Sequence, residues 1–120
     1  MKKRILLVED EEDNMQILRD LLAADYELTE ALNGEKALMA VAEQRPDLIL
    51  MDIQLPIMDG YEATRRIKAD PASQSIPIIA ITSYALGQDE QRARAAGCDD
   101  FVAKPYSPRQ LLLKIREYLS

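Results

Sequence analysis

Short apolar runs alternate with amphipathic segments along the whole chain, and this alternation narrows the available folds more than any other feature. The third and fourth runs, "DLILMD" and "PIIAIT", are apolar at consecutive positions, which is typical of parallel strands covered on both faces. The second run, "YELTE", alternates polar and apolar residues and predicts an edge strand. The five predicted strands span residues 4–8, 26–30, 47–52, 77–82 and 101–103.

Between these runs, apolar residues recur at helical spacing. They are Met15, Leu18, Leu21 and Leu22, then Ala37, Leu38 and Val41, and near the end Leu111, Leu112, Ile115 and Leu119. Asn33 and Gly34 mark the turn into the second helix, and Pro108 suits the first turn of the last one. The segment 86–97 has a helical pattern whose apolar face is mostly alanine, so we expect that helix to be held loosely.

Five β–α units predict an α/β fold with a doubly wound, five-stranded parallel sheet, helices on both faces and right-handed crossovers. The expected strand order is 2-1-3-4-5, and ligands of such sheets bind beyond the carboxyl ends of strands 1 and 3. The 120 residues contain no linker or repeat. We therefore expect one domain over residues 1–120, with no output domain after it.

The composition excludes several kinds of function. The chain has no histidine and one cysteine, so histidine-based triads, phosphohistidine on this chain, internal disulfides and thiolate zinc sites are ruled out. A net charge of −6 argues against non-specific binding to nucleic acid or to anionic membranes. No secretory signal is visible, and a reduced cytoplasmic setting fits, with Cys98 as a packing residue. Carboxylates, amines, guanidinium groups and hydroxyls remain for chemistry.

Polar residues stand at the carboxyl ends of four predicted strands. Glu9 and Asp10 follow strand 1, Asp52 ends strand 3, Thr82 ends strand 4, and Lys104 follows strand 5. Neighbouring strands lie about 5 Å apart, so the acids of strands 1 and 3 must crowd together. Carboxylates so close raise each other's pKa unless a cation neutralises them, and one lysine is not enough for three acids. A site of oxygen ligands selects Mg²⁺, with Mn²⁺ as an alternative.

The same groups can handle a phosphoryl group. Mg²⁺ keeps part of its water shell and completes it with phosphate oxygens, which the Thr82 hydroxyl and the Lys104 ammonium would also meet. Asp52 can then be a nucleophile, because carboxylates form aspartyl phosphates. The neighbouring acids Glu11, Glu12 and Asp13 need no such role, since a solvated acidic run is favourable at a helix N-terminus.

The segments "LLVEDEEDN", "DLILMDIQLPIMDG", "IIAITSYA" and "GCDDFVAKPYS", in this order and spacing, resemble the receiver domains of response regulators. The resemblance covers essentially the whole chain. Within the family, the sequence looks most similar to single-domain regulators of the cell-division kind. It implies a flavodoxin-like receiver fold in two-component signalling. It also implies that Asp52 accepts a phosphoryl group from a phosphohistidine on a sensor histidine kinase or a histidine phosphotransfer protein.

The resemblance further assigns roles to the residues at the strand ends. Asp10, Asp52 and the backbone carbonyl of Gln54 would ligate Mg²⁺ directly, and Glu9 would act through water. Thr82 and Lys104 would bind the phosphoryl oxygens, with a cis peptide between Lys104 and Pro105.

The resemblance also implies a switch. Gln54 and Tyr84 match positions that tune hydrolysis of the aspartyl phosphate. Thr82 would move toward the phosphoryl group, and Phe101 would turn inward. Phe101 matches the switching aromatic position, at which tyrosine is common in this family. The face of helix 4, strand 5 and helix 5 would change shape and control binding of a downstream protein, without direct contact to nucleic acid or membrane. The protein would be a monomer, or a homodimer that forms on phosphorylation.

Two other classes of protein fit these residues less well. A Mg²⁺-dependent aspartyl-phosphate hydrolase of the haloacid dehalogenase type needs a second aspartate two residues after the nucleophile, where this chain has Gln54. A flavodoxin-like FMN carrier needs a Ser/Thr/Gly phosphate loop after strand 1, where this chain has five acids. We therefore expect a signalling module, with self-catalysed phosphorylation and slow autodephosphorylation as its only chemistry.

Overall fold

The computed structural model describes residues 2–82 and 87–119, which form five strands and five helices in strict alternation. The strands are β1 (Arg4–Val8), β2 (Glu27–Ala31), β3 (Leu48–Asp52), β4 (Ile78–Thr82) and β5 (Asp100–Ala103). The helices are α1 (Glu12–Leu22), α2 (Gly34–Glu43), α3 (Gly60–Ala69), α4 (Gly87–Ala96) and α5 (Pro108–Leu119). All five predicted strands are present: the bounds of β1 match the prediction, and those of the other four differ from it by no more than one residue at either end.

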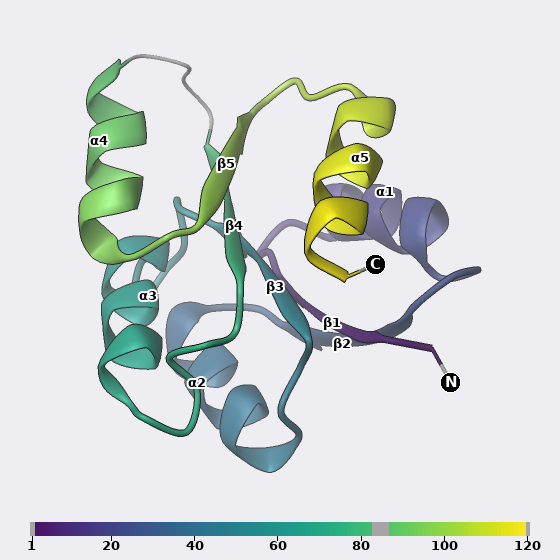
Figure 1. Cartoon of the computed structure of the whole chain (residues 1–120). Coiled ribbons are helices and arrows are strands. Elements are labelled where there is room, and N and C mark those ends of the chain that lie inside the picture. Colours follow the sequence, from purple (N-terminus) through teal and green to yellow (C-terminus); the bar gives the residue numbers. More distant parts are fainter. Residues whose placement is uncertain (1, 83–86, 120) are drawn as a thin grey trace.

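The strands form one parallel sheet in the order β2-β1-β3-β4-β5, which confirms the predicted doubly wound α/β architecture (Figure 1). β2 lies at an edge of the sheet, as its alternating pattern predicts. The register pairs Val8 with Met51, Asp52 with Ile81, and Thr82 with Ala103. The polar residues that end these strands are thereby brought to one edge of the sheet.

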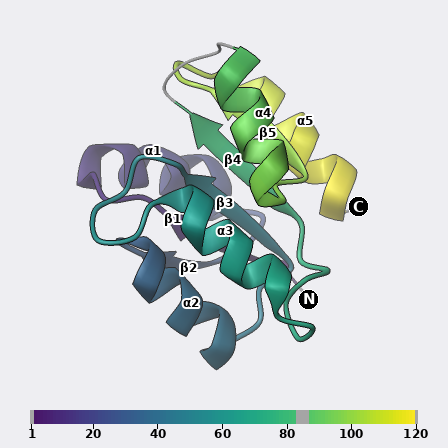
Figure 2. The ribbon, with the colours of Figure 1, turned by 90° about the vertical axis from the view of Figure 1, so that its left-hand side faces the viewer.

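Helices cover both faces of the sheet: α1 and α5 lie on one side, and α2, α3 and α4 on the other (Figures 1 and 2). Alternate residues of each strand point to opposite faces of the sheet and therefore belong to different cores. In β1, Leu6 and Val8 pack with the α2–α4 side, whereas Ile5 and Leu7 pack with the α1–α5 side. Two buried faces explain why the central strands are apolar at consecutive positions.

The helix ends agree with the sequence signals. The Asn33 side chain accepts a hydrogen bond from the amide of Lys36 at 2.8 Å and caps α2, and Asp59 caps α3 in the same way through Glu62 at 2.9 Å. α5 begins at Pro108. Within residues 90–96 of α4, the buried side chains are alanines, so the thin apolar face is confirmed, while the loose attachment of this helix stays a prediction.

Within residues 2–82 and 87–119, no helix combines the length and the apolar character that crossing a membrane requires.

Candidate functional site

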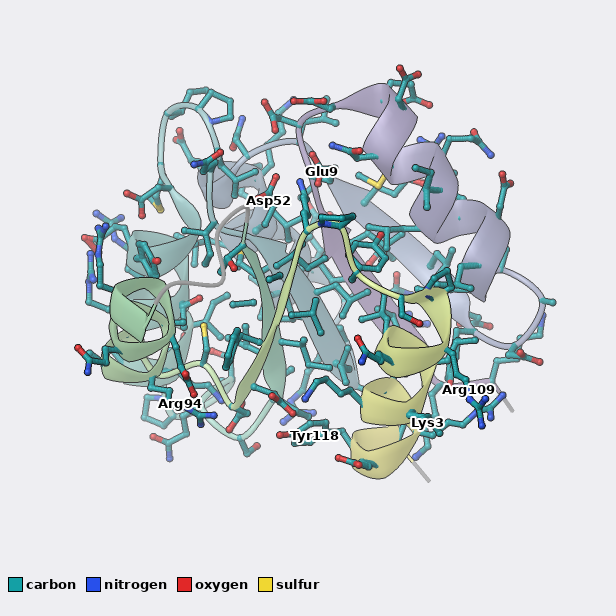
Figure 3. All side chains as sticks on the ribbon, turned by 90° about the horizontal axis from the view of Figure 1, so that it is seen from above. Lys3, Glu9, Asp52, Arg94, Arg109 and Tyr118 are labelled. Atoms are coloured by element: carbon teal, nitrogen blue, oxygen red, sulfur yellow. The ribbon has the colours of Figure 1, made fainter. Side chains whose placement is uncertain are left out.

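Three carboxylates meet at the carboxyl edge of the sheet. Glu9 follows β1, Asp10 comes next, and Asp52 is the last residue of β3, and one oxygen of each lies within 4.8 Å of the others. Figure 3 shows Glu9 and Asp52 close together where the strands end. Glu9 is 1% exposed and Asp52 3% exposed, whereas Asp10 is open to solvent. The predicted convergence of acids from strands 1 and 3 is confirmed.

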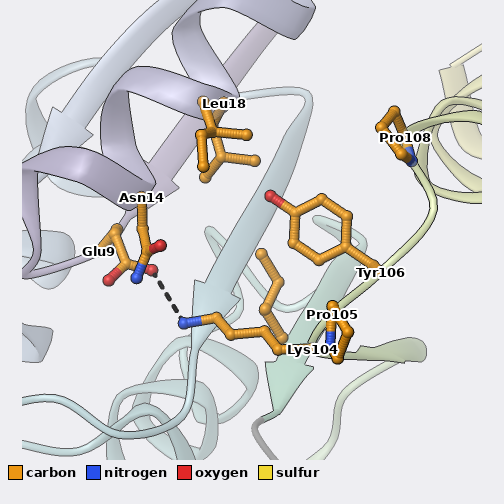
Figure 4. A pocket seen from close by; sticks show the side chains of 9 residues that line it. Glu9, Asn14, Leu18, Lys104, Pro105, Tyr106 and Pro108 are labelled. Atoms are coloured by element: carbon orange, nitrogen blue, oxygen red, sulfur yellow. Dashed lines mark hydrogen bonds and ion pairs between the residues drawn. The ribbon is translucent and has the colours of Figure 1, made fainter.

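Each of the two buried carboxylates accepts a hydrogen bond from a backbone amide, and both contact the same lysine. Glu9 accepts a hydrogen bond from the amide of Glu11 at 3.2 Å, and Asp52 accepts one from the amide of Gln54 at 3.2 Å. The Lys104 ammonium lies 3.5 Å from Glu9 Oε2 and 3.5 Å from Asp52 Oδ2 (Figure 4, which draws the contact with Glu9). These contacts fix both side chains and leave the cluster short of positive charge.

The electrostatics of the cluster favour protonation of the two buried acids. Burial raises the pKa of Glu9, and the neighbouring charge of Asp52 raises it further. Burial also raises the pKa of Asp52, although the ammonium of Lys104 and the amide of Gln54 pull it downward. Two acids held apart from water with one lysine between them form a site that gains stability from a further cation.

The donor set fits Mg²⁺. All candidate ligand atoms are carboxylate oxygens, which this ion prefers, and the chain has no histidine to recruit a softer metal. Octahedral Mg²⁺ holds oxygens at about 2.1 Å, which places opposite ligands about 4 Å apart. Adjacent ligands lie closer still, about 3 Å apart. The observed limit of 4.8 Å exceeds both spans, so direct ligation by all three carboxylates would require their side chains to move inward, and a carboxylate that stays in place would reach the ion through water. Direct ligation through the carbonyl of Gln54 stays a prediction.

The groups expected at the phosphoryl oxygens lie on β4 and directly after β5. Thr82 is buried at the end of β4, and its carbonyl accepts a hydrogen bond from the Lys104 amide at 2.6 Å. The peptide bond between Lys104 and Pro105 is cis, as the resemblance implies. Phe101 is half-buried in β5, and the guanidinium of Arg94 lies 5.8 Å from its ring centre.

Tyr84, the second residue expected to tune hydrolysis, lies outside the described residues.

The loop after Asp52 folds back closely onto the end of β3. The amide of Gly60 donates to the carbonyl of Ile53 at 3.0 Å, and a β-carbon at position 60 would lie 2.4 Å from the carbonyl oxygen of Asp52. Only glycine permits this approach. The motif "MDG" carries this glycine, but its spacing alone does not reveal the contact with the backbone of Asp52.

A cavity of about 380 Å³ adjoins the acids between α1 and the loop from β5 to α5 (Figure 4). Glu9 and Lys104 line it together with the mostly apolar wall formed by Asn14, Ile17, Leu18, Ile81, Pro105, Tyr106 and Pro108. Burial and the charge of Glu9 raise the pKa of the Tyr106 phenol. Sequence reasoning missed this cavity, and the one available signal was the apolar Ile17, which lies outside the helical stripe.

Residues 5–116 match the response regulator receiver domain family. The chain belongs to this family. As a receiver domain it is a signalling module of two-component systems, and the sequence resemblance is thereby confirmed.

Individual relatives agree with this assignment. The receiver is 45% identical to the polar-differentiation response regulator DivK of Brucella anthropi, an alignment that covers 99% of this chain and 98% of DivK. It superimposes on a putative response regulator of Chloroflexus aurantiacus with a TM-score of 0.95 and 29% identity, over 99% of this chain and 98% of the other.

The receiver also superimposes on the receiver domain of a sensor histidine kinase from Pseudomonas aeruginosa PAO1. The TM-score is 0.91 and the identity 37%, over 98% of both chains. That structure has a magnesium ion coordinated in its active-site cleft.

Substituting Asp52 by asparagine is expected to raise the melting temperature of the metal-free receiver at neutral pH. The pKa of Asp52 in the folded state lies above its ordinary value of 3.8, so the folded state favours the protonated carboxyl. The stability that this side chain contributes is therefore fully present below pH 3.8 and is lost as the pH rises through the folded-state pKa. The variant should therefore match the wild type in acid, gain an advantage as the pH rises from 3.8 through the folded-state pKa of Asp52, and keep that advantage above it. Thermal unfolding of both proteins in EDTA across this range measures the difference.

Added Mg²⁺ is expected to stabilise the wild type at pH 7 and to reduce the advantage of the variant, because the ion binds the ionised site of the folded state. A wild type that melts above Asp52→Asn at pH 7 in EDTA would contradict the electrostatic account of the cluster.

Proposed function

We propose that this receiver is a stand-alone, phosphorylation-controlled binding module in the reducing environment of the cytoplasm. Asp52 accepts the phosphoryl group from a phosphohistidine on a sensor histidine kinase or a histidine phosphotransfer protein. The observation that carries the proposal is the burial of Asp52 at the rigid end of β3, in contact with Lys104 and within 4.8 Å of Glu9 and Asp10. DivK, a full-length relative, is itself a response regulator.

In the proposed transfer, a carboxylate oxygen of Asp52 forms a bond to phosphorus while the bond from phosphorus to the donor's imidazole nitrogen breaks. The electron pair of the broken bond stays on that imidazole. Bound Mg²⁺ would neutralise the excess negative charge of the acids and the phosphoryl group. Asp10, Asp52 and the carbonyl of Gln54 would hold the ion, with Glu9 acting through water.

Thr82 and Lys104 would then bind the phosphoryl oxygens, one through its hydroxyl and the other through its ammonium. Lys104 is suited to this exchange because it already rests 3.5 Å from Asp52 and keeps part of its surface in solvent. Gln54 and Tyr84 would set how fast water removes the phosphoryl group.

The output would be a change of the surface formed by α4, β5 and α5. A groove of about 510 Å³ there is lined by Phe101, Tyr106 and Leu113 among others, and Leu113 is 49% exposed. Movement of Thr82 toward the phosphoryl group would allow Phe101 to turn inward. α4 opposes such repacking weakly, because its described buried side chains are alanines. A downstream protein, or a second copy of the receiver, would bind the altered face.

The experiment compares wild-type receiver with Lys104→Ala by NMR, with Mg²⁺ and acetyl phosphate as the donor. In the wild type, the amide resonances of α4, β5 and α5 are expected to shift on phosphorylation. Lys104→Ala should still bind Mg²⁺, since it loses a competing cation, but its resonances on this face should stay in place. Wild-type-like shifts in Lys104→Ala would refute the role of the ammonium, and unshifted wild-type resonances after complete phosphorylation would refute the switch.

A further inference from the structure

The last turn of α4 is closed by two backbone hydrogen bonds. The amide of Gly97 donates to the carbonyl of Arg94 at 3.0 Å, and the amide of Cys98 donates to the carbonyl of Ala93 at 3.0 Å. Gly97 has a φ angle of 109°, so these bonds form the glycine-ended arrangement that closes many helices. The side chain of Cys98 is buried, with its Sγ 3.7 Å from the Thr64 hydroxyl of α3. The end of α4 therefore follows one fixed backbone path toward β5.

The side chains of Lys68 and Asp99 tie this end of α4 to α3 and β4. The ammonium of Lys68, in the last turn of α3, donates to the Asp99 carboxylate at 2.9 Å. It also donates to the carbonyls of Ile76 at 2.7 Å and Gln74 at 3.2 Å, so all three of its protons are used. The same Asp99 oxygen accepts from the amide of Ile78 at 2.8 Å, and the Asp99 amide donates to the Ile78 carbonyl at 2.9 Å. We call this set of contacts the Lys68–Asp99 anchor.

The anchor also packs against the turn that ends α4. A β-carbon at position 97 would lie 2.9 Å from the Cγ of Lys68, so the aliphatic stem of this lysine lies directly on the backbone of Gly97. From α5, the hydroxyl of Tyr118 donates to the carbonyl of Asp99 at 3.2 Å. Elements α3, β4, α4 and α5 thus meet at the anchor.

Contacts earlier in α4 are of a different kind. Within residues 90–96, Ala93 is buried, and the guanidinium of Arg92 lies 4.4 Å from the ring centre of Tyr61 on α3. Methyl packing and ring stacking depend less on direction than hydrogen bonds do, so they tolerate a tilt of the helix. The Lys68–Asp99 anchor consists of hydrogen bonds and does not tolerate one.

The two ends of α4 connect to opposite edges of the sheet. Its end leads into the amino end of β5, where Asp99 pairs with Ile78. Its start follows β4 along the chain, and Thr82, the last residue of β4, lies at the same edge as Asp52. A displacement of Thr82 therefore reaches α4 at its start, while the anchor holds its end.

We propose that the Lys68–Asp99 anchor is the fixed pivot of α4, so that phosphorylation of Asp52 tilts this helix about Gly97 while the anchor stays closed. The inference rests on the proposed function, because it specifies how the output surface moves. A tilt displaces the start of the helix most and its end least. Without the anchor, α4 has no fixed end, and its orientation depends less on the state of Asp52.

The first test measures the orientation of α4 in the wild type by NMR, with Mg²⁺, before and after addition of excess acetyl phosphate. Residual dipolar couplings of the α4 amides should report a changed angle between the helix and the sheet. The amide resonances of Ile78 and Asp99 and the ammonium resonance of Lys68 should stay in place. Anchor resonances that shift as far as those at the start of α4 would show that the helix moves as a whole, and would overturn the pivot.

The second test breaks the anchor in the unphosphorylated receiver. Lys68→Met removes the ammonium and keeps an unbranched stem beside Gly97. Arg66→Met is the matched control, because it removes the same charge from the same helix and its side chain is 59% exposed. Hydrogen exchange of the α4 amides should become about tenfold faster in Lys68→Met, since a charged donor loses three acceptors, and should match the wild type in the control.

A double-mutant cycle shows whether the two anchor residues act as a unit. Asp99→Asn keeps an oxygen for the amide of Ile78 but removes the charge that faces Lys68, so it should accelerate exchange less than Lys68→Met does. Combined with Lys68→Met, it should add little further acceleration. Wild-type exchange in Lys68→Met, or an equal acceleration throughout β1 and β3, would overturn the anchor, because the first shows no restraint and the second a general loss of stability.

The final comparison links the anchor to the switch. Lys68→Met should incorporate phosphate from acetyl phosphate like the wild type, since Lys68 lies at the opposite edge of the sheet from Asp52, but its α4 couplings should change less on phosphorylation. A full change of the α4 couplings in labelled Lys68→Met would overturn the pivot. Failure of the wild type to take up phosphate on Asp52 would instead refute the proposed function, and the exchange measurements, which need no phosphate, would still decide whether the anchor holds α4.

Discussion

Replacing Asp52 by asparagine is expected to abolish phosphorylation by acetyl phosphate in the presence of Mg²⁺. The amide has neither the charge nor the free oxygen nucleophile that attacks phosphorus. Among the described residues, Glu9 is the other buried carboxylate in contact with Lys104, and the proposed function assigns it to the metal through water rather than to the phosphoryl group. Removal of a nucleophile from a preorganised site lowers the rate by about 10³-fold or more. Intact-protein mass spectrometry should find one added phosphate on the wild type and none on the variant.

The matched control is Asp13→Asn, which removes an exposed acid in the first turn of α1, outside the cluster. It should be labelled like the wild type, so that the loss in the Asp52 variant cannot be ascribed to the change in net charge. Phosphate on any residue of Asp52→Asn, at a rate near that of the wild type, would disprove the assignment of the acceptor.

Replacing Gly60 by alanine is expected to destabilise the fold by about 3 kcal/mol, the upper part of the range for overpacking a rigid site. The new methyl group would lie 2.4 Å from the carbonyl oxygen of Asp52 and 2.8 Å from the α-carbon of Ile53, and both are backbone atoms that cannot rotate away. Relief requires α3 to move away from β3. Urea unfolding measures the loss, and slower labelling by acetyl phosphate should accompany it.

Arg65→Ala, in the same helix, provides the comparison for Gly60→Ala. The Arg65 side chain is 54% exposed and lies 3.7 Å from a Glu62 oxygen, a surface pair that contributes about 0.5 kcal/mol or less. If Gly60→Ala lost no more stability than this surface variant, the loop would be able to shift freely and its close approach to Asp52 would be unimportant.

The fold was predictable from the sequence because each element carries a local signal that agrees with the tertiary structure. Consecutive apolar residues in β3 and β4 indicate strands covered on both faces, and the alternating β2 indicates an edge. The caps and start signals at Asn33 and Pro108 fall at the observed helix ends. The strand order then follows from few permitted topologies, and it brings the acids of β1 and β3 together.

Other features could not be predicted, because they depend on distances between backbone segments. The near contact of Gly60 with the carbonyl of Asp52, and of Gly34 with Met58, requires the folded positions of two loops. The left-handed conformation of Ile57 contradicts the local preference of its residue type, so the sequence argues against it. The cavity beside Glu9 likewise exists only after α1 and the β5–α5 loop are placed around it.

Three of these strained or crowded positions, Gly34, Ile57 and Gly60, lie in the loops after β2 and β3, whereas a fourth, Gly97, lies after α4 and is crowded by Lys68. In the cores, alternate strand residues face opposite sides of the sheet, and the sequence pattern reveals this. The conformations of the loops after β2 and β3 instead depend on the site at the sheet edge. This distribution agrees with the general tendency of local rules to fail at functional sites.

The central claim is that oxygens from β1 and β3 bind Mg²⁺ and leave Asp52 free to accept a phosphoryl group. A crystal structure of the receiver with Mg²⁺ and beryllofluoride, a phosphoryl mimic, tests it most directly. We expect the metal on Asp10, Asp52 and the carbonyl of Gln54, and the beryllofluoride bonded to Asp52 with its fluorines on Thr82 and Lys104. Beryllofluoride bonded to another residue, or a metal bound away from Asp10 and Asp52, would contradict it.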